Sequence, residues 1–120
     1  MPDFEGTKPI FLQPSDARVP YAFEYTVCSA TTANDGFLPY GHTLSSVVTS
    51  VHREDATVQT TAILATSSAT GQVHTVFLSY PTSVGAVTGK YHMTFVATIS
   101  DGTTTYVREL DFNRLIVRNL

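Results

Sequence analysis

The C-terminal quarter of the chain contains a long run in which apolar and polar residues alternate. Every second residue from Tyr91 to Ile99 is apolar, which gives one apolar and one mixed face to a pleated strand. Asp101 and Gly102 follow this run after Ser100. An Asp-Gly pair supplies the positive φ angles of tight two-residue turns. Residues 104–108 then begin a return strand. The sequence therefore predicts a β-hairpin of the kind that closes many small β-sandwiches, which bind more often than they catalyse.

Composition favours the same fold class. The chain has 120 residues, enough for about one domain and too few for a fold plus a separate catalytic domain. Threonine and serine are abundant, whereas the helix formers leucine, lysine and glutamate are sparse. Only 14% of the residues are charged and the net charge is -3, so there is no basic patch to recruit nucleic acid. We expect a nearly all-β protein without a nucleic-acid partner.

Neither export nor membrane insertion is indicated. The N-terminus lacks the basic start and the apolar core of a signal peptide, and no apolar run approaches the roughly 20 residues that span a bilayer. The single cysteine, Cys28, cannot form an internal disulfide, so packing or partner subunits must supply stability. We interpret Cys28 as a small buried hydrophobe, because no basic neighbour activates its thiol.

Residues 1–20 form a proline-rich segment that is unsuited to a helix and that we predict to be an extended arm. Two interpretations of its apolar residues stay open. In the first, Ile10 begins an edge strand of the chain's own sandwich. In the second, Phe4, Ile10 and Phe11 dock on a neighbouring subunit, since an extended apolar arm is suited to strand addition. The two arrangements can coexist along one arm.

Residues 21–120 alternate strand patterns with turn signals about every ten residues. No repeat or linker divides them. The expected fold is an all-β, immunoglobulin-like β-sandwich of about seven strands, preceded by the N-terminal arm. Within the last strand, the apolar pattern changes phase between Tyr106 and Phe112, which predicts a β-bulge near residues 108–111. The remaining strands are expected at residues 21–28, 44–53, 57–66 and 72–80, and a turn is expected at residues 67–71.

Tyr91 adds a detail typical of immunoglobulin domains. It follows Gly89 at the start of its strand, and Met93 comes two residues later. In immunoglobulin domains a tyrosine stands two residues before the second core cysteine. We therefore expect Met93 to occupy that core place, an arrangement that resembles the disulfide-free versions of the fold.

The loop expected at residues 29–42 is more apolar than a solvated loop requires. Phe37, Leu38 and Tyr40 lie between the turn residues Gly36 and Gly41. These three side chains either cover one end of the sandwich or form part of a contact surface. Both interpretations stay open.

No pattern in the chain predicts catalysis, a metal site or a cofactor. The histidines form no spaced ligand pair, so we expect half-buried or exposed strand residues, with a cross-strand zinc site between His74 and His92 as the alternative. The ionisable cluster at residues 52–55 is expected at a solvated hairpin end. Nucleophile and phosphate-binding motifs are missing, so we expect a non-enzyme. The four histidines are His42, His52, His74 and His92.

From Pro14 onward the chain resembles the small immunoglobulin-like structural proteins of tailed bacteriophages known as fibre-tail adaptor proteins. It departs from them in having no tryptophan, with Tyr25 and Val48 in comparable neighbourhoods. The residues that carry the resemblance and define the fold are Gly41, Gly89, Tyr91, Asp101 and Gly102. The shared segments are Pro14-x-Asp16, the alternating strand ending near Val27, Gly41-His-Thr-Leu-Ser-Ser-Val-Val, Val76-Phe-Leu-Ser-Tyr, the glycine-rich residues 85–89, Tyr91-x-x-Thr-Phe-x-Ala-Thr-x-Ser-Asp-Gly and a final arginine-bearing strand.

The resemblance implies a virion structural protein made in the host cytoplasm. Proteins of this size and fold also resemble the decoration or cement proteins of icosahedral capsids, and we expect that role, with the major capsid protein as partner and a homotrimer as assembly. A tail or fibre adaptor is the alternative, and a carbohydrate-binding module is less favoured. Aromatic and apolar side chains remove much area from water at an interface. The candidate partner anchors are Phe4, Ile10, Phe11, Phe37 and Tyr40.

Overall fold

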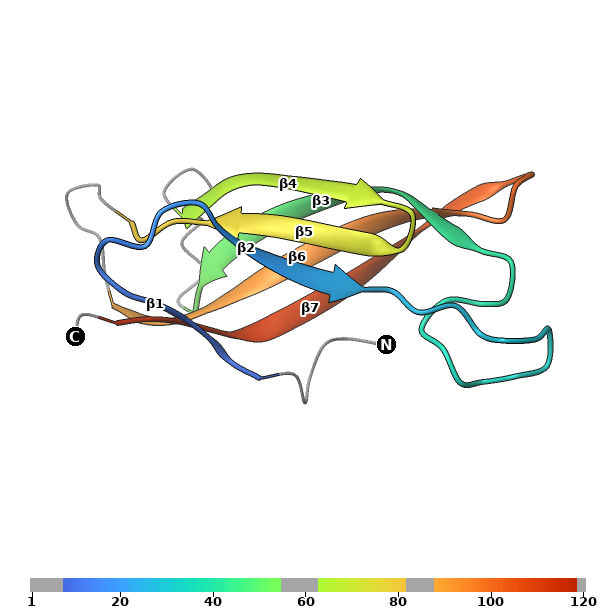
Figure 1. Ribbon diagram of the computed structural model, residues 1–120, viewed down its shortest axis with the longest axis horizontal. Coiled ribbons are helices and arrows are strands. Elements are labelled where there is room, and N and C mark those ends of the chain that lie inside the picture. The colour runs from blue at the N-terminus through green and yellow to red at the C-terminus, as the bar shows by residue number, and fades with distance from the viewer. Residues whose placement is uncertain (1–7, 55–62, 82–87, 119–120) are drawn as a thin grey trace.

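The computed structural model describes residues 8–54, 63–81 and 88–118, which form seven strands in two facing sheets (Figure 1). This confirms the all-β sandwich. The described residues hold no helix with the length and apolarity to cross a membrane. The strands are β1 (Ile10–Leu12), β2 (Val19–Glu24), β3 (Thr43–Arg53), β4 (Leu64–Thr70), β5 (Val73–Leu78), β6 (Gly89–Ser100) and β7 (Thr105–Val117).

The strand order is that of an immunoglobulin domain. One sheet has the order β1-β7-β6-β3 and the other the order β2-β5-β4. In immunoglobulin domains strands C, F and G form one sheet and strands B, E and D lie in the other, which matches β3, β6, β7 and β2, β5, β4. The first strand joins the edge of β7 in parallel instead of extending the β2 sheet. The edge of β2 opposite β5 therefore has no strand partner among the described residues.

The core is built on the alternation of β6. Its five inward side chains, from Tyr91 to Ile99, are each at most 1% exposed. Phe23 of β2 packs across from the other sheet, with its ring centroid 5.0 Å from that of Phe95 and 5.3 Å from that of Phe112. The expected core positions of Tyr91 and Met93 are thereby confirmed.

His74 lies inside this core rather than at a surface. It is fully buried on β5, its Nε2 is 3.0 Å from the hydroxyl of Thr49, and its ring stands edge-on to Phe95. Burial lowers the pKa of His74 to about 4, so the imidazole is neutral near neutral pH. The expectation of an exposed or half-buried strand histidine was therefore wrong for His74. The alternative, a cross-strand zinc site with His92, was also wrong, because β5 and β6 belong to different sheets.

β1 is the edge strand of the larger sheet. Ile10 and Leu12 face the core, and the backbone N–H of Arg118 donates to the carbonyl of Leu12 at 2.9 Å. Phe11 points the other way, is 37% exposed, and has the Arg118 guanidinium carbon 4.1 Å from its ring centroid. The described part of residues 1–20 thus contributes β1 and the start of β2 to the sandwich.

The hairpin turn between β6 and β7 is wider than predicted. Ser100 pairs with Thr105, so four residues form the turn instead of the two expected from Asp101-Gly102. The Asp101 carboxylate accepts the backbone N–H groups of Thr103 at 2.9 Å and Thr104 at 2.8 Å. These hydrogen bonds lower the pKa of Asp101 and stabilise the longer turn, which is a known use of aspartate.

A predicted turn and a predicted β-bulge also lie elsewhere in the structure. The turn expected at residues 67–71 is strand as far as Thr70, because its serines and threonines continue an alternating pattern, and the chain turns at Gly71 and Gln72. Residues 57–62 of the strand expected before it lie outside the described residues. The bulge expected at residues 108–111 instead lies between Phe112 and Leu115, where two exposed residues oppose one position of β6.

Candidate partner-binding site

The candidate site is the loop of residues 25–42, here called the end loop, which carries the chain from β2 in one sheet to β3 in the other. It lies at the same end of the sandwich as the turns that join β4 to β5 and β6 to β7 (Figure 1). Its first residue, Tyr25, is buried, and its backbone N–H donates to the carbonyl of Gln72 at 2.7 Å. The loop therefore starts from a fixed point in the core.

Backbone hydrogen bonds fold the end loop back on itself. Val27 and Leu38 form an isolated parallel bridge, and the N–H of Cys28 donates to the carbonyl of Leu38 at 2.9 Å. The N–H groups of Phe37 and Leu38 both donate to the carbonyl of Thr26, at 2.6 and 2.7 Å. The two ends of the loop are thus bonded together, which limits its backbone freedom.

A glycine and an aspartate make this closure possible. A Cβ atom on Gly36 would lie 2.5 Å from the backbone nitrogen of Cys28, so a side chain there would displace the backbone. Asp35 accepts the backbone N–H of Ser29 at 3.0 Å and its hydroxyl at 2.7 Å. These bonds from Ser29 lower the pKa of the Asp35 carboxyl. From the sequence, Gly36 was identified only as a turn residue.

The end loop is also tied to the β6–β7 hairpin. Nδ1 of His42 lies 2.7 Å from the hydroxyl of Tyr106 on β7, and the two rings meet edge to face at 5.6 Å. The positive form of His42 contributes to the lowered pKa of Asp101 in the hairpin turn, after the larger effect of the turn's backbone N–H donors. Three connections that are distant in sequence thus form one structured end.

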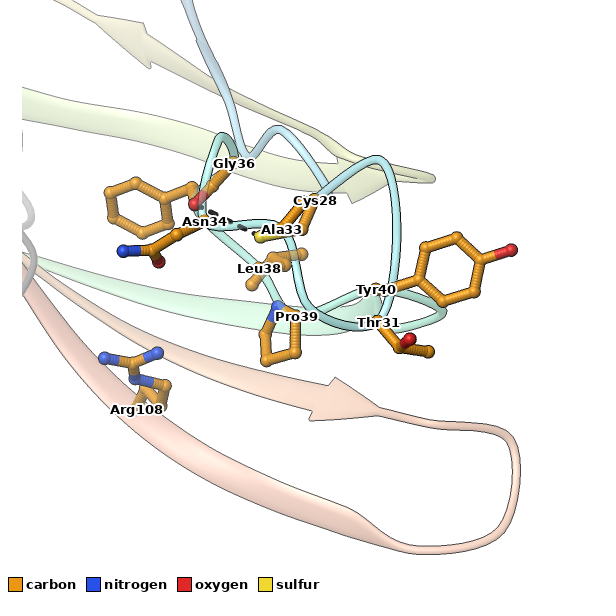
Figure 2. A pocket seen from close by; sticks show the side chains of 10 residues that line it. Cys28, Thr31, Ala33, Asn34, Gly36, Leu38, Pro39, Tyr40 and Arg108 are labelled. Atoms are coloured by element: carbon orange, nitrogen blue, oxygen red, sulfur yellow. Dashed lines mark hydrogen bonds between the residues drawn. The ribbon is translucent and has the colours of Figure 1, made fainter.

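Between the end loop and β7 lies a pocket of about 230 Å³ (Figure 2). Arg108 forms its wall on the β7 side, on the same strand face as the buried Leu110. Among the described residues Arg108 has no ion pair. The lining residues are Cys28, Thr31, Ala33, Asn34, Gly36, Phe37, Leu38, Pro39, Tyr40 and Arg108. A cation at the wall of a small pocket is suited to an acidic or carbonyl group.

The three apolar loop residues serve two different purposes. Leu38 is fully buried, and Phe37 is half-buried with its ring edge-on to Tyr25 at 5.5 Å, so both cover the end of the core. Tyr40 is 53% exposed and extends away from the sandwich (Figure 2). Leu38 and Phe37 thus fit the interpretation that the loop covers one end of the sandwich. The contact surface, with Phe37 and Tyr40 as partner anchors, stays a prediction.

The other candidate anchors lie elsewhere. Ile10 and Phe11 are on β1, which pairs with the far end of β7, close to Leu115 and away from the hairpin turn. Ile10 is 8% exposed and belongs to the chain's own core, whereas Phe11 is accessible. Phe4 lies outside the described residues. The structure thus divides the described candidates between two separate places.

The positions that carried the family resemblance occupy turns and core. Gly41, Gly89 and Gly102 have φ angles of 80°, 145° and 96°, which side-chain-bearing residues rarely adopt. Tyr91 is buried and Asp101 holds the hairpin turn. These residues shape the fold and none of them lines the pocket.

Arg108 is the site residue that sequence reasoning missed. Its place on β7 was predicted, but only the pairing of sheets brings the end loop over it. Within the described ranges no three metal-ligating side chains gather. No family model matches the chain, and no curated protein or solved structure matches it.

Proposed function

We propose that this protein is a non-enzymatic bacteriophage virion component, a decoration or cement protein that binds and stabilises the major capsid shell. The virion assignment rests on the sequence resemblance from Pro14 onward. The observation that carries the binding role is Tyr40, an exposed aromatic side chain on a hydrogen-bonded loop beside a pocket. Such a sandwich acts mechanically, by burying loop and arm surface across joints between capsid subunits.

The end loop is suited to binding because its conformation is already fixed. Ordering a flexible loop on association costs free energy, and a preformed loop avoids much of that cost. Tyrosine is among the residues that most often dominate interface energetics, since it buries a large rigid ring and keeps a hydroxyl for hydrogen bonding. Tyr40 is therefore the expected centre of the interface.

Arg108 specifies the chemistry that the partner presents. Its guanidinium borders the pocket and has no ion pair among the described residues, so an aspartate, glutamate or backbone carbonyl of the partner completes its hydrogen bonding. We expect the capsid surface to place such a group beside an apolar contact for Tyr40. Phe11 on β1 supplies a second contact in a proposed homotrimer.

The first test is the copy number of the chain in purified phage particles whose genome encodes it. Quantitative mass spectrometry against the major capsid protein is expected to give a ratio near one to one. A ratio of a few per hundred would instead assign the chain to the tail, as the alternative fibre or tail adaptor. Absence from the particles would reject the virion role, and glycan-array binding that depends on Tyr40 would then favour a carbohydrate-binding module.

The second test locates the interface. Shells that lack the chain are mixed with Tyr40→Ala and Arg108→Gln variants, and co-sedimentation is measured. We expect Tyr40→Ala to weaken binding about 30-fold or more, the usual effect of losing a dominant aromatic anchor. Val48→Ala is the matched control, because Val48 is 67% exposed on the face of the larger sheet, away from the end loop. Equal binding by all variants would exclude the end loop as the interface.

A further inference from the structure

Two histidines that are 40 positions apart in sequence meet on the outer face of the larger sheet. His52 on β3 and His92 on β6 are direct partners in the antiparallel register. Their neighbours Val51 and Met93 are fully buried, so both imidazoles are on the opposite, solvent side. The ring centroids are 5.4 Å apart and the planes differ by 21°. We call these two residues the histidine pair.

The histidine pair is accessible and partly oriented. Both side chains are half-buried, so solvent reaches them. Nε2 of His52 lies 2.9 Å from the hydroxyl oxygen of Ser50 on the same strand. When that Nε2–H donates to Ser50, the Nδ1 lone pair of His52 is left for a ligand. A hydrogen bond of this kind to one ring nitrogen is the usual support for a metal-binding histidine.

We propose that the histidine pair binds one divalent transition-metal ion of the zinc or nickel class. Neutral imidazole is a preferred ligand of these ions, with metal–nitrogen bonds of about 2.0–2.1 Å. Two nitrogens on one tetrahedral ion are then about 3.4 Å apart, so binding requires the two imidazole rings to rotate from their stacked arrangement. This proposal does not depend on the proposed virion function.

The surroundings indicate a site of moderate affinity. No third metal-ligating side chain joins the pair among the described residues, so water fills the other positions. Lys90 lies two residues from His92 on the same strand face, and its charge opposes a cation. Glu54, whose backbone N–H donates to the carbonyl of Lys90 at 3.1 Å, contributes the opposite charge nearby. The bond strength therefore comes from imidazole coordination rather than from a field of acidic groups.

The test measures NiCl₂ and ZnCl₂ binding to the full chain by isothermal titration calorimetry and thermal unfolding. We expect one ion per chain, and at 100 times the dissociation constant a roughly 100-fold higher ratio of folded to unfolded protein. In nitrogen NMR, addition of zinc is expected to shift the imidazole signals of His52 and His92. His52→Gln and His92→Gln are each expected to weaken binding at least tenfold while retaining the fold.

His42→Gln is the matched control, because His42 lies at the other end of β3, beside Tyr106. It is expected to bind metal as the natural chain does. Any one of three results would overturn the proposal: no saturable binding at millimolar metal, unchanged affinity in His92→Gln, or imidazole shifts confined to His42. One ion per two chains, lost in both pair variants, would support the pair with a second copy completing the coordination.

Discussion

β1 and the end loop both contain apolar side chains that were predicted from the sequence to be partner anchors. Different interactions hold these two segments in place. β1 is held by parallel pairing with β7 and by the burial of Ile10 and Leu12. The end loop is held by backbone hydrogen bonds around Thr26 and Leu38 and by the close approach permitted at Gly36. Side-chain burial dominates in the first region, and local backbone geometry dominates in the second.

The difference explains which side chains remain available to a partner. On β1 the strand alternation directs two of three side chains into the chain's own core and leaves only Phe11 outside. In the end loop, Phe37 and Leu38 close the core, so Tyr40 extends outward from a fixed backbone. A side chain that the end loop exposes to a partner is not needed in the core. A side chain that a core strand buries stabilises the fold and is therefore not available to a partner.

The largest expected effect comes from weakening the packing of β1 on the core. Leu12→Ala removes a fully buried side chain and should lower the free energy of unfolding by about 3–4 kcal/mol. Urea denaturation measures the change. Thr105→Ala, at an exposed position of β7, is the control and should stay within about 0.5 kcal/mol of the natural chain. A loss below about 1 kcal/mol for Leu12→Ala would mean that β1 contributes little to the core.

Lowering the pH should destabilise the fold through His74, which contacts Tyr25 at the base of the end loop. Because its folded-state pKa is about 4 and the unfolded value is 6.5, the unfolded chain binds the proton more tightly. The contribution of His74 to the free energy of unfolding is therefore fully present above pH 6.5. The free energy of unfolding falls by about 3 kcal/mol as the pH drops to about 4.

Urea denaturation across that pH range measures the loss. His74→Gln should remove this part of the pH dependence, whatever its effect on stability at pH 7. His42→Gln should keep it. An identical pH slope in His74→Gln and the natural chain would show that His74 titrates normally.

A smaller effect is expected when the closure of the end loop is broken. Gly36→Ala places a Cβ against the backbone of Cys28 and should cost about 2 kcal/mol through the forced backbone shift. Hydrogen exchange at the Cys28 and Leu38 amides should become faster. Gly41→Ala separates sterics from backbone strain, because its Cβ has open space and only the positive φ opposes it, at about 1 kcal/mol. Equal losses for the two variants would reject the steric explanation.

The smallest expected effect concerns the exposed side of β1. Phe11→Ala removes the contact between its ring and the Arg118 guanidinium, worth about 0.5–1 kcal/mol at such a site. Thermal unfolding of the isolated chain measures it, and Phe11→Tyr should preserve the contact. A loss as large as that of Leu12→Ala would mean that both faces of β1 are structural, so Phe11 would not be free for a partner.

Much of the fold could be predicted from local patterns, and much of the site could not. Alternation located β6 and its buried face, because a two-residue period reports burial directly. The widths of turns were less predictable, since Asp101 bonds two further backbone groups and lengthens its turn. Tyr40 was found because an apolar loop residue is unusual. Arg108 was not assigned to the site, because its relation to the end loop depends on sheet packing.

The sequence by itself determined an all-β chain, the core face of β6 and the turns that need glycine, because these follow from side-chain periodicity and φ preferences among near neighbours. Only the tertiary structure decided which residues meet across strands. It buried His74 between sheets and brought His52 beside His92. Register and sheet stacking set these contacts, and both depend on the packing of the whole core rather than on any local segment.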